Sequence, residues 1–172
     1  MTSSKRKGLI GSFIIIFVII LLDQLLKIWV KTHMSIGEEI PLLGNWFKLL
    51  FIENPGMAFG LMGGGGIVKL LLSIFRIVAV IALFFVLFRL TKKQTKFGIL
   101  FGISLITAGA IGNIIDCVFY GKIFHYADWL HGQVVDMFSL SFFPPIFNLA
   151  DSAITVGVFY MVIFQWKWLK SL

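Results

Sequence analysis

The chain has 172 residues, of which 59% are hydrophobic and 13% are charged, and its mean hydropathy is +0.97. A soluble domain of this size would be about a quarter charged, so the composition indicates a single integral membrane domain over residues 1–172. The net charge of +7 lies mostly at the ends of apolar runs, which argues against nucleic acid as a partner. The single cysteine, Cys117, excludes a disulfide within the chain.

Four apolar runs are each long enough to cross a bilayer, which takes about 20 residues. We expect mainly α structure, with a bundle of spans at about residues 9–30, 67–90, 97–119 and 147–166. Basic residues precede the first run as they do in a secretory signal, but no cleavage site of small residues follows, so we interpret it as a retained span. The third run is rich in Gly and Ala at i, i+4 spacing, which predicts close helix contacts and a central position.

Two longer connecting segments, at about residues 31–66 and 120–146, fall on the same side of this bundle. Residues 40–53 of the first segment are aromatic and β-branched in places, which predicts short strands, and the turn signal Asn54-Pro55-Gly56 follows. The second segment carries aromatic residues typical of a membrane–water interface, including Tyr126 and Trp129.

The charges predict the orientation of the bundle. Nine of the fifteen basic residues fall on the side opposite these connecting segments, and all eight acidic residues lie toward the side of the segments. Because basic residues are retained on the cytoplasmic side, we expect both termini in the cytoplasm and the acidic side facing outward.

Two tetrapeptides, Asn113-Ile-Ile-Asp116 and Asn148-Leu-Ala-Asp151, lie near the outward ends of the third and fourth runs. Opposite helix directions would bring Asp116 and Asp151 to a similar depth, with the two amides on opposite sides of the carboxylates. Two carboxylates in a poorly solvated site titrate as a unit, and one can act as a base while the other acts as an acid. The alternative is a pair of polar anchors at helix ends, although a negative charge at a helix C-terminus, as for Asp116, is unfavourable.

Other polar residues in apolar surroundings have simpler interpretations. Asp23 is interpreted as a structural contact of Lys27 at i+4 rather than as a group that takes part in chemistry. Asp136 could be solvated, and Arg76 is interpreted as an interhelical partner or as a side chain that reaches the interface.

A metal site is a weaker possibility. His125, Asp128 and His131 have a spacing that could recruit a metal on a helix. The chain has no His-Glu-x-x-His motif, so we expect no metal.

Five blocks of residues in order carry a family resemblance. They are Asp23-Gln-Leu-Leu-Lys27, Asn54-Pro-Gly-Met-Ala-Phe-Gly60, Gly109-Ala-Ile-Gly-Asn-Ile-Ile-Asp116, Val134-Val-Asp136 and Phe147-Asn-Leu-Ala-Asp151. With these blocks the chain resembles bacterial lipoprotein signal peptidases, the signal peptidase II family. The resemblance implies four transmembrane helices, an extracytoplasmic β-cradle and a short extracytoplasmic helix, which we expect at residues 125–131.

The resemblance also implies an activity and a site. The activity is that of an aspartic endopeptidase of the bacterial inner membrane, which cleaves diacylglyceryl-modified prolipoproteins just before the modified cysteine, near the extracytoplasmic face and without a cofactor. Membrane lipids would be further partners, and we expect a monomer. Asp116 and Asp151 match the catalytic pair; the supporting positions are Asp23, Asn54, Gly56, Asn113, Asp136 and Asn148. The match departs at Cys117, where the family commonly has Arg.

Two other classes of function stay open. Membrane aspartates relay protons in small ion-coupled transporters, but here the acidic residues gather toward one side and leave no relay across the membrane. The other alternative is a non-enzymatic assembly factor with an outward binding loop.

Overall fold

The computed structural model describes residues 3–55, 65–93 and 95–170. The chain forms two compact units, each assembled from separate segments. Unit 1 comprises Met1–Leu22, Ile77–Gly112 and Leu149–Leu172, and unit 2 comprises Asp23–Arg76 and Asn113–Asn148. Three helices contribute residues to both units, and the single domain over the whole chain stays a prediction.

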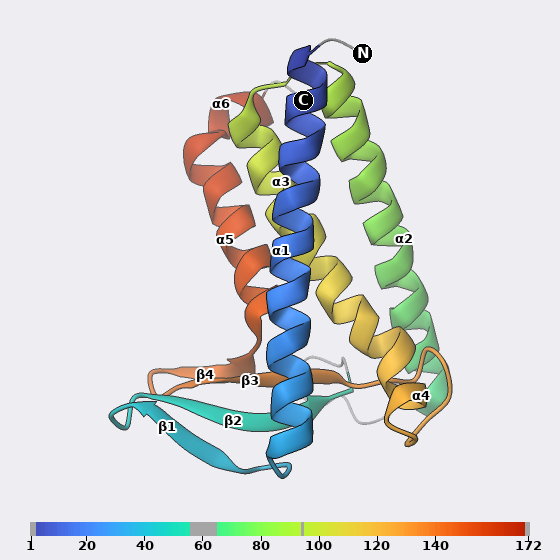
Figure 1. The fold of residues 1–172 in the computed structure, drawn as a ribbon, viewed down its shortest axis with the longest axis vertical. Coiled ribbons are helices and arrows are strands. Elements are labelled where there is room, and N and C mark those ends of the chain that lie inside the picture. The colour runs from blue at the N-terminus through green and yellow to red at the C-terminus, as the bar shows by residue number, and fades with distance from the viewer. Residues whose placement is uncertain (1–2, 56–64, 94, 171–172) are drawn as a thin grey trace. The chain divides into compact units, whose positions relative to one another are not determined.

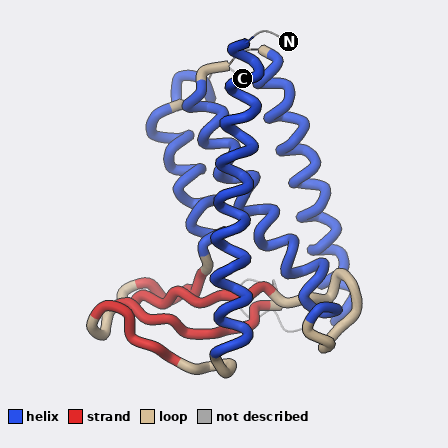
Figure 2. Tube along the Cα trace, viewed as in Figure 1, coloured by secondary structure: helices blue, strands red, loops and turns tan. Residues whose placement is uncertain are grey.

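The long helices are drawn in Figure 1 and are blue in Figure 2: α1 (Ser3–His33), α2 (Gly65–Lys92), α3 (Phe97–Ile115) and α5 (Leu149–Phe164). In the described part of the chain, three helical segments are long and apolar enough to cross a membrane: Arg6–His33, Lys69–Lys92 and Phe97–Ile123. Helix α5 is apolar but has only 16 residues, or about 24 Å, against a hydrocarbon core of about 30 Å. The architecture is therefore that of a membrane protein with three long apolar helices and a shorter fourth.

Helix α3 provides much of the packing in unit 1. In its most apolar window 56% of residues are buried, against 17% in the corresponding windows of α1 and α2. Gly102 lies against the Met161 side chain and Gly109 against the backbone of Ala150, so a Cβ at either glycine would collide with α5. The predicted close contacts and central position of this small-residue helix are confirmed.

Unit 2 contains a four-stranded antiparallel sheet in the order β1-β2-β3-β4, visible in Figure 1 and red in Figure 2. Its strands are β1 (Glu39–Leu43), β2 (Phe47–Asn54), β3 (Val134–Leu140) and β4 (Phe143–Phe147). The short strands predicted over residues 40–53 are confirmed, whereas β3 and β4 were not predicted. The core of this unit joins the end of α1 to the sheet through six buried residues: Val30, Met34, Phe51, Tyr120, Val135 and Met137.

The segment after α3 differs from the prediction. The helical path continues through a π-helical turn, η2 (Asp116–Tyr120), into α4 (Gly121–Ile123). Residues 124–133 then form turns and irregular structure. His125 and Leu130 have positive φ angles of 58° and 67°, which an α-helix cannot contain. The expectation of a short helix at residues 125–131 is therefore wrong.

Candidate active site

A buried lysine holds two carboxylates together in unit 2. The Lys27 Nζ atom lies 2.9 Å from Asp23 Oδ2 and 2.9 Å from Asp116 Oδ2, and all three side chains have no exposed surface. Asp23 and Lys27 are one helical turn apart on α1, whereas Asp116 comes from the start of η2. The predicted contact between Asp23 and Lys27 is confirmed, and it is part of a larger cluster that includes Asp116.

The other contacts of Asp116 complete its surroundings. Gln24 Nε2 donates to Asp116 Oδ1 over 3.0 Å, and the backbone N–H of Val135 donates to Oδ2 over 3.2 Å. Tyr120 in turn donates its hydroxyl to Gln24 Oε1 over 3.1 Å. Both carboxylate oxygens are thus engaged by a cation or an N–H group, as a buried charge requires.

The two predicted asparagines meet directly. Asn148 Nδ2 lies 3.1 Å from Asn113 Oδ1, which also accepts from Lys27 Nζ over 2.9 Å. Two side chains in contact cannot lie on opposite sides of a carboxylate pair. The prediction that these amides bracket the carboxylates is therefore wrong, and Asn113 instead connects Lys27 to Asn148.

Asp136 on β3 is the second buried carboxylate centre of unit 2, with 3% of its surface exposed. Asn148 Nδ2 donates to its Oδ1 over 2.8 Å, and Asn54 Nδ2 donates to its Oδ2 over 3.0 Å. Strand pairing explains the second contact, because Asn54 lies opposite Val134, two residues before Asp136. The interpretation of Asp136 as a solvated side chain is wrong.

The two remaining predicted site residues are Asp151 and Gly56. Asp151 is a half-buried residue in the first turn of α5, which belongs to unit 1. Gly56 lies outside the described residues. Unit 2 thus brings together Asp23, Asn54, Asn113, Asp116, Asp136 and Asn148. The pairing of Asp116 with Asp151 stays a prediction.

Sequence reasoning paired Lys27 with Asp23 but did not predict its contact with Asp116, and it missed Gln24 and Tyr120. The available signal was Lys27 itself, a charged residue inside an apolar run and therefore costly without partners. Gln24 and Tyr120 are ordinary residue types in their segments, and only the fold brings them into contact.

Arg76 on α2 contacts the position where the chain departs from the family pattern. Its Nη1 atom donates to Cys117 Sγ over 2.9 Å. On the preceding turn, the Ser73 hydroxyl lies 3.0 Å from the carbonyl oxygen of Leu130. The interpretation of Arg76 as an interhelical partner is confirmed.

The histidine motif is engaged in local contacts. His131 Nδ1 lies 2.9 Å from the carbonyl oxygen of Trp129, and Asp128 pairs with Lys122 at 3.4 Å. No group of three or more His, Cys, Asp or Glu side chains among the described residues is arranged to hold a metal ion.

Comparisons with known proteins identify the family. The model of the family described as signal peptidase (SPase) II matches residues 15–167. A lipoprotein signal peptidase of Porphyromonas gingivalis is 39% identical, over 87% of this chain and 80% of its own. One of Amoebophilus asiaticus is 40% identical, over 84% of this chain and 72% of its own.

Solved structures agree with this assignment. One described as a bacterial membrane enzyme, at 1.9 Å resolution, has a TM-score of 0.69 and 30% identity, over 89% of this chain and 90% of its own. A second structure with the same description, at 2.3 Å resolution, has a TM-score of 0.67 and 28% identity, over 91% and 88% of the two chains. This chain belongs to the signal peptidase II family, whose members are aspartic peptidases.

Proposed function

We propose that this protein removes signal peptides from prolipoproteins whose lipobox cysteine carries diacylglycerol, cutting just before that cysteine. The family match and the names of the relatives, lipoprotein signal peptidases, support this substrate class. The single observation that carries an aspartic mechanism is the buried Asp136 carboxyl group, which the Asn54 and Asn148 amides hold at 3.0 and 2.8 Å. These three residues come from β2, from β3 and from the position just before α5.

Asp151 is the first member of the proposed catalytic pair. It lies three residues after Asn148, so the chain keeps their Cα atoms within about 11 Å of each other. Asn148 itself donates to Asp136 and contacts Asn113. Chain connectivity therefore supports a partner for Asp151 among the aspartates around Asn148.

The contacts favour Asp136 rather than Asp116 as that partner. Asp116 is paired with the Lys27 ammonium at 2.9 Å, and its oxygens also accept from Gln24 and from the Val135 N–H. Because Lys27, Gln24 and Val135 already engage both of its oxygens, Asp116 has little room to bind and orient a water molecule as well. Asp136 is held by the Asn54 and Asn148 amides, neutral donors that can bond a carboxyl group before and after it gains a proton. The sequence-based choice of Asp116 is the competing hypothesis.

The proposed reaction uses the two carboxyl groups in turn. The ionised one takes a proton from water as the water oxygen attacks the scissile carbonyl carbon, and the protonated one donates to the carbonyl oxygen. When the tetrahedral intermediate collapses, the peptide C–N bond breaks, the leaving nitrogen takes a proton from the protonated carboxyl group, and a hydroxyl of the intermediate gives its proton to the ionised carboxylate, which restores the pair. The amides of Asn54 and Asn148 orient one carboxyl group throughout. The lipid anchor would supply proximity by keeping the bond at a fixed depth.

The proposed topology has four spans, both termini in the cytoplasm and the catalytic groups near the outer face of the inner membrane. The charges of the two units support it. Unit 1 carries nine of the basic residues and one acidic residue, Asp151, whereas unit 2 carries the other seven acidic residues. Basic residues are retained on the cytoplasmic side. We propose further that the enzyme is a monomer in contact with membrane lipids.

The test compares matched aspartate variants of the purified protein on a diacylglyceryl-modified prolipoprotein. Asp136→Asn and Asp151→Asn should each abolish cleavage without loss of folding. Asp116→Asn should retain measurable cleavage while lowering thermal stability. Asp128→Asn, which changes an exposed carboxylate paired only at 3.4 Å, is the control.

Two outcomes would overturn the proposal. Cleavage by folded Asp136→Asn, together with no cleavage by folded Asp116→Asn, would restore Asp116 as the partner of Asp151. Loss of wild-type cleavage on addition of a chelator would replace the two-carboxylate mechanism with a metal-dependent one.

A further inference from the structure

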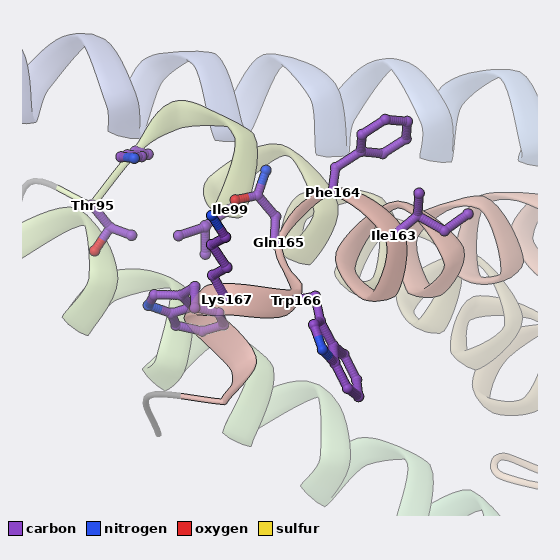
Figure 3. Close-up of a pocket in the computed structure, with 9 residues that line it drawn as sticks. Thr95, Ile99, Ile163, Phe164, Gln165, Trp166 and Lys167 are labelled. Carbon is purple, nitrogen blue, oxygen red and sulfur yellow. The ribbon is translucent and has the colours of Figure 1, made fainter.

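A pocket of about 910 Å³ opens in unit 1, where the loop before α3 meets the break between α5 and the short helix α6 (Trp166–Leu169). Residues that line it include Thr95, Lys96, Ile99, Phe164, Gln165 and Lys167. Figure 3 shows the Lys167 side chain directed toward Ile99 and Gln165, and Trp166 directed away from them. No residue that lines this pocket belongs to the buried network described above, whose Asp116 and Asp136 are in unit 2.

The fold builds this pocket from three features. Helix α5 ends at Phe164, and Gln165 leaves the helical conformation with φ −116° and ψ 19° before α6 begins. Gly98 lies so close to the Gln165 amide and the Tyr160 hydroxyl that a Cβ there would collide with both. Ile99 forms a buried wall, with 2% of its surface exposed, and Trp168 packs against the same core. The walls therefore belong to the packed part of unit 1.

The pocket combines positive charge with exposed apolar surface. Lys96 and Lys167 line it, and Lys170 lies one helical turn away with its Nζ atom 5.2 Å from the Trp166 ring centroid. None of the described residues that line the pocket is acidic, and unit 1 as a whole carries nine basic residues against one acidic residue, Asp151. On its outer side, Ile163 and Phe164 are 64% and 68% exposed, as side chains in contact with lipid chains are.

We propose that this pocket binds an anionic phospholipid. Lys96 and Lys167 would hold the phosphate, the Thr95 hydroxyl and the Gln165 amide would bond its oxygens or the glycerol, and one acyl chain would lie along Ile163 and Phe164. Charge complementarity selects an anionic headgroup, because lysines near a membrane surface attract phospholipids with net negative charge. The adjacent lipid-facing side chains select a lipid over a free anion. The volume falls within the range of about 300–1,000 Å³ that small-molecule sites occupy.

The experiment measures lipid binding to the full-length protein in detergent by native mass spectrometry, with phosphatidylglycerol and phosphatidylcholine titrated separately. The Lys96→Gln/Lys167→Gln variant should bind phosphatidylglycerol about 30-fold more weakly than the wild type. Lys92→Gln/Lys93→Gln is the matched control, because it removes the same charge from the same end of unit 1 without altering a pocket residue. Lys96→Arg/Lys167→Arg keeps the charge and should keep the affinity.

The results that would overturn the proposal are distinct. An equal loss of affinity in the Lys92/Lys93 control would mean general attraction to a basic surface. Equal affinity for phosphatidylcholine and phosphatidylglycerol would show that the pocket does not select lipids by net negative charge. Competition by inorganic phosphate at lipid-like concentrations would identify a site for the free anion instead of a lipid. Thermal unfolding of each variant without lipid verifies that the pocket residues were changed in a folded protein.

Discussion

The Arg76 guanidinium on α2 donates a hydrogen bond to the Cys117 sulfur on η2, with 2.9 Å between Nη1 and Sγ. The family resemblance places an arginine at position 117, immediately after Asp116, where this chain has the cysteine. Here a cation from another helix occupies the neighbourhood of that position. We therefore expect that one arginine beside η2, supplied either by α2 or by position 117, is sufficient for this part of the fold.

This arrangement predicts the outcome of an exchange. Cys117→Arg alone should destabilise the protein, because it brings a second guanidinium against Arg76 within a buried site. Adding Arg76→Leu to Cys117→Arg should recover much of the loss, with a coupling of about 1 kcal/mol or more between the positions. Thermal unfolding of the two single variants and the double variant measures the coupling. Additive effects would mean that the two positions do not share a role.

Removing Lys27 should be among the most damaging single changes. Lys27→Met leaves Asp23 and Asp116 without the ammonium that lies 2.9 Å from each, and breaking a buried pair costs about 3–5 kcal/mol. The triple variant Asp23→Asn/Lys27→Met/Asp116→Asn should be more stable than Lys27→Met, because it removes the uncompensated charges together. Denaturant unfolding of both variants provides the comparison. If the triple variant is no more stable than Lys27→Met, the packing of these side chains, and not their charges, determines the contribution of the cluster to stability.

Asn148 should affect turnover more than substrate affinity. Its amide nitrogen contacts Asn113 Oδ1, the Val135 carbonyl oxygen and Asp136 Oδ1. Asn148→Ala leaves these buried acceptors short of a donor, a loss of about 1–3 kcal/mol, and frees the Asp136 carboxyl group to rotate. We expect kcat to fall by about 10-fold or more while KM changes little. Asp128→Asn serves as the unaffected control, and an unchanged kcat in Asn148→Ala would contradict the orienting role.

Gly132 should tolerate no side chain. A Cβ at this position would meet the backbone carbonyls of Asp116 and Cys117, and the Gly132 N–H already donates to the Cys117 carbonyl oxygen over 2.9 Å. Gly132→Ala should therefore displace η2 and lower both stability and activity. Gly37→Ala is the comparison, because Gly37 has φ +85° in open surroundings and should cost only about 1 kcal/mol. In thermal unfolding, Gly132→Ala should have a clearly lower Tm than Gly37→Ala.

The first strand pair could be predicted from the sequence, whereas the second could not. Residues 40–53 combine aromatic and β-branched residues with turn signals on both sides. Strand β4 contains Pro144 and Pro145, which argue against a strand unless it lies at the edge of a sheet. β4 is such an edge strand. Its position depends on the pairing of β3 with β2, which are separated by about 80 residues, and no local sequence pattern predicts a pairing between such distant segments.

The candidate site shows the same division. The contact of Asp23 with Lys27 could be predicted, because side chains four residues apart on a helix are neighbours. The pairing of Lys27 with Asp116 joins residues 89 positions apart, and the contact of Asn54 with Asp136 depends on strand register. The sequence identified Asn113, Asp116 and Asn148 as polar residues at the ends of apolar runs, where burial needs a partner. It could not assign their partners, and for this reason the asparagines were expected apart when they are in contact.

The backbone of Val135 contacts both the lysine cluster, through Asp116, and the asparagine pair, through Asn148. Its N–H donates to Asp116 and its carbonyl oxygen accepts from Asn148, while its own side chain is fully buried. Amide hydrogen exchange at this position would therefore report on the lysine cluster and the asparagine contacts together. A peptide substrate that pulls Asp136 out of place would also be sensed there, so one isotope-labelled valine could follow the site from the resting protein through binding.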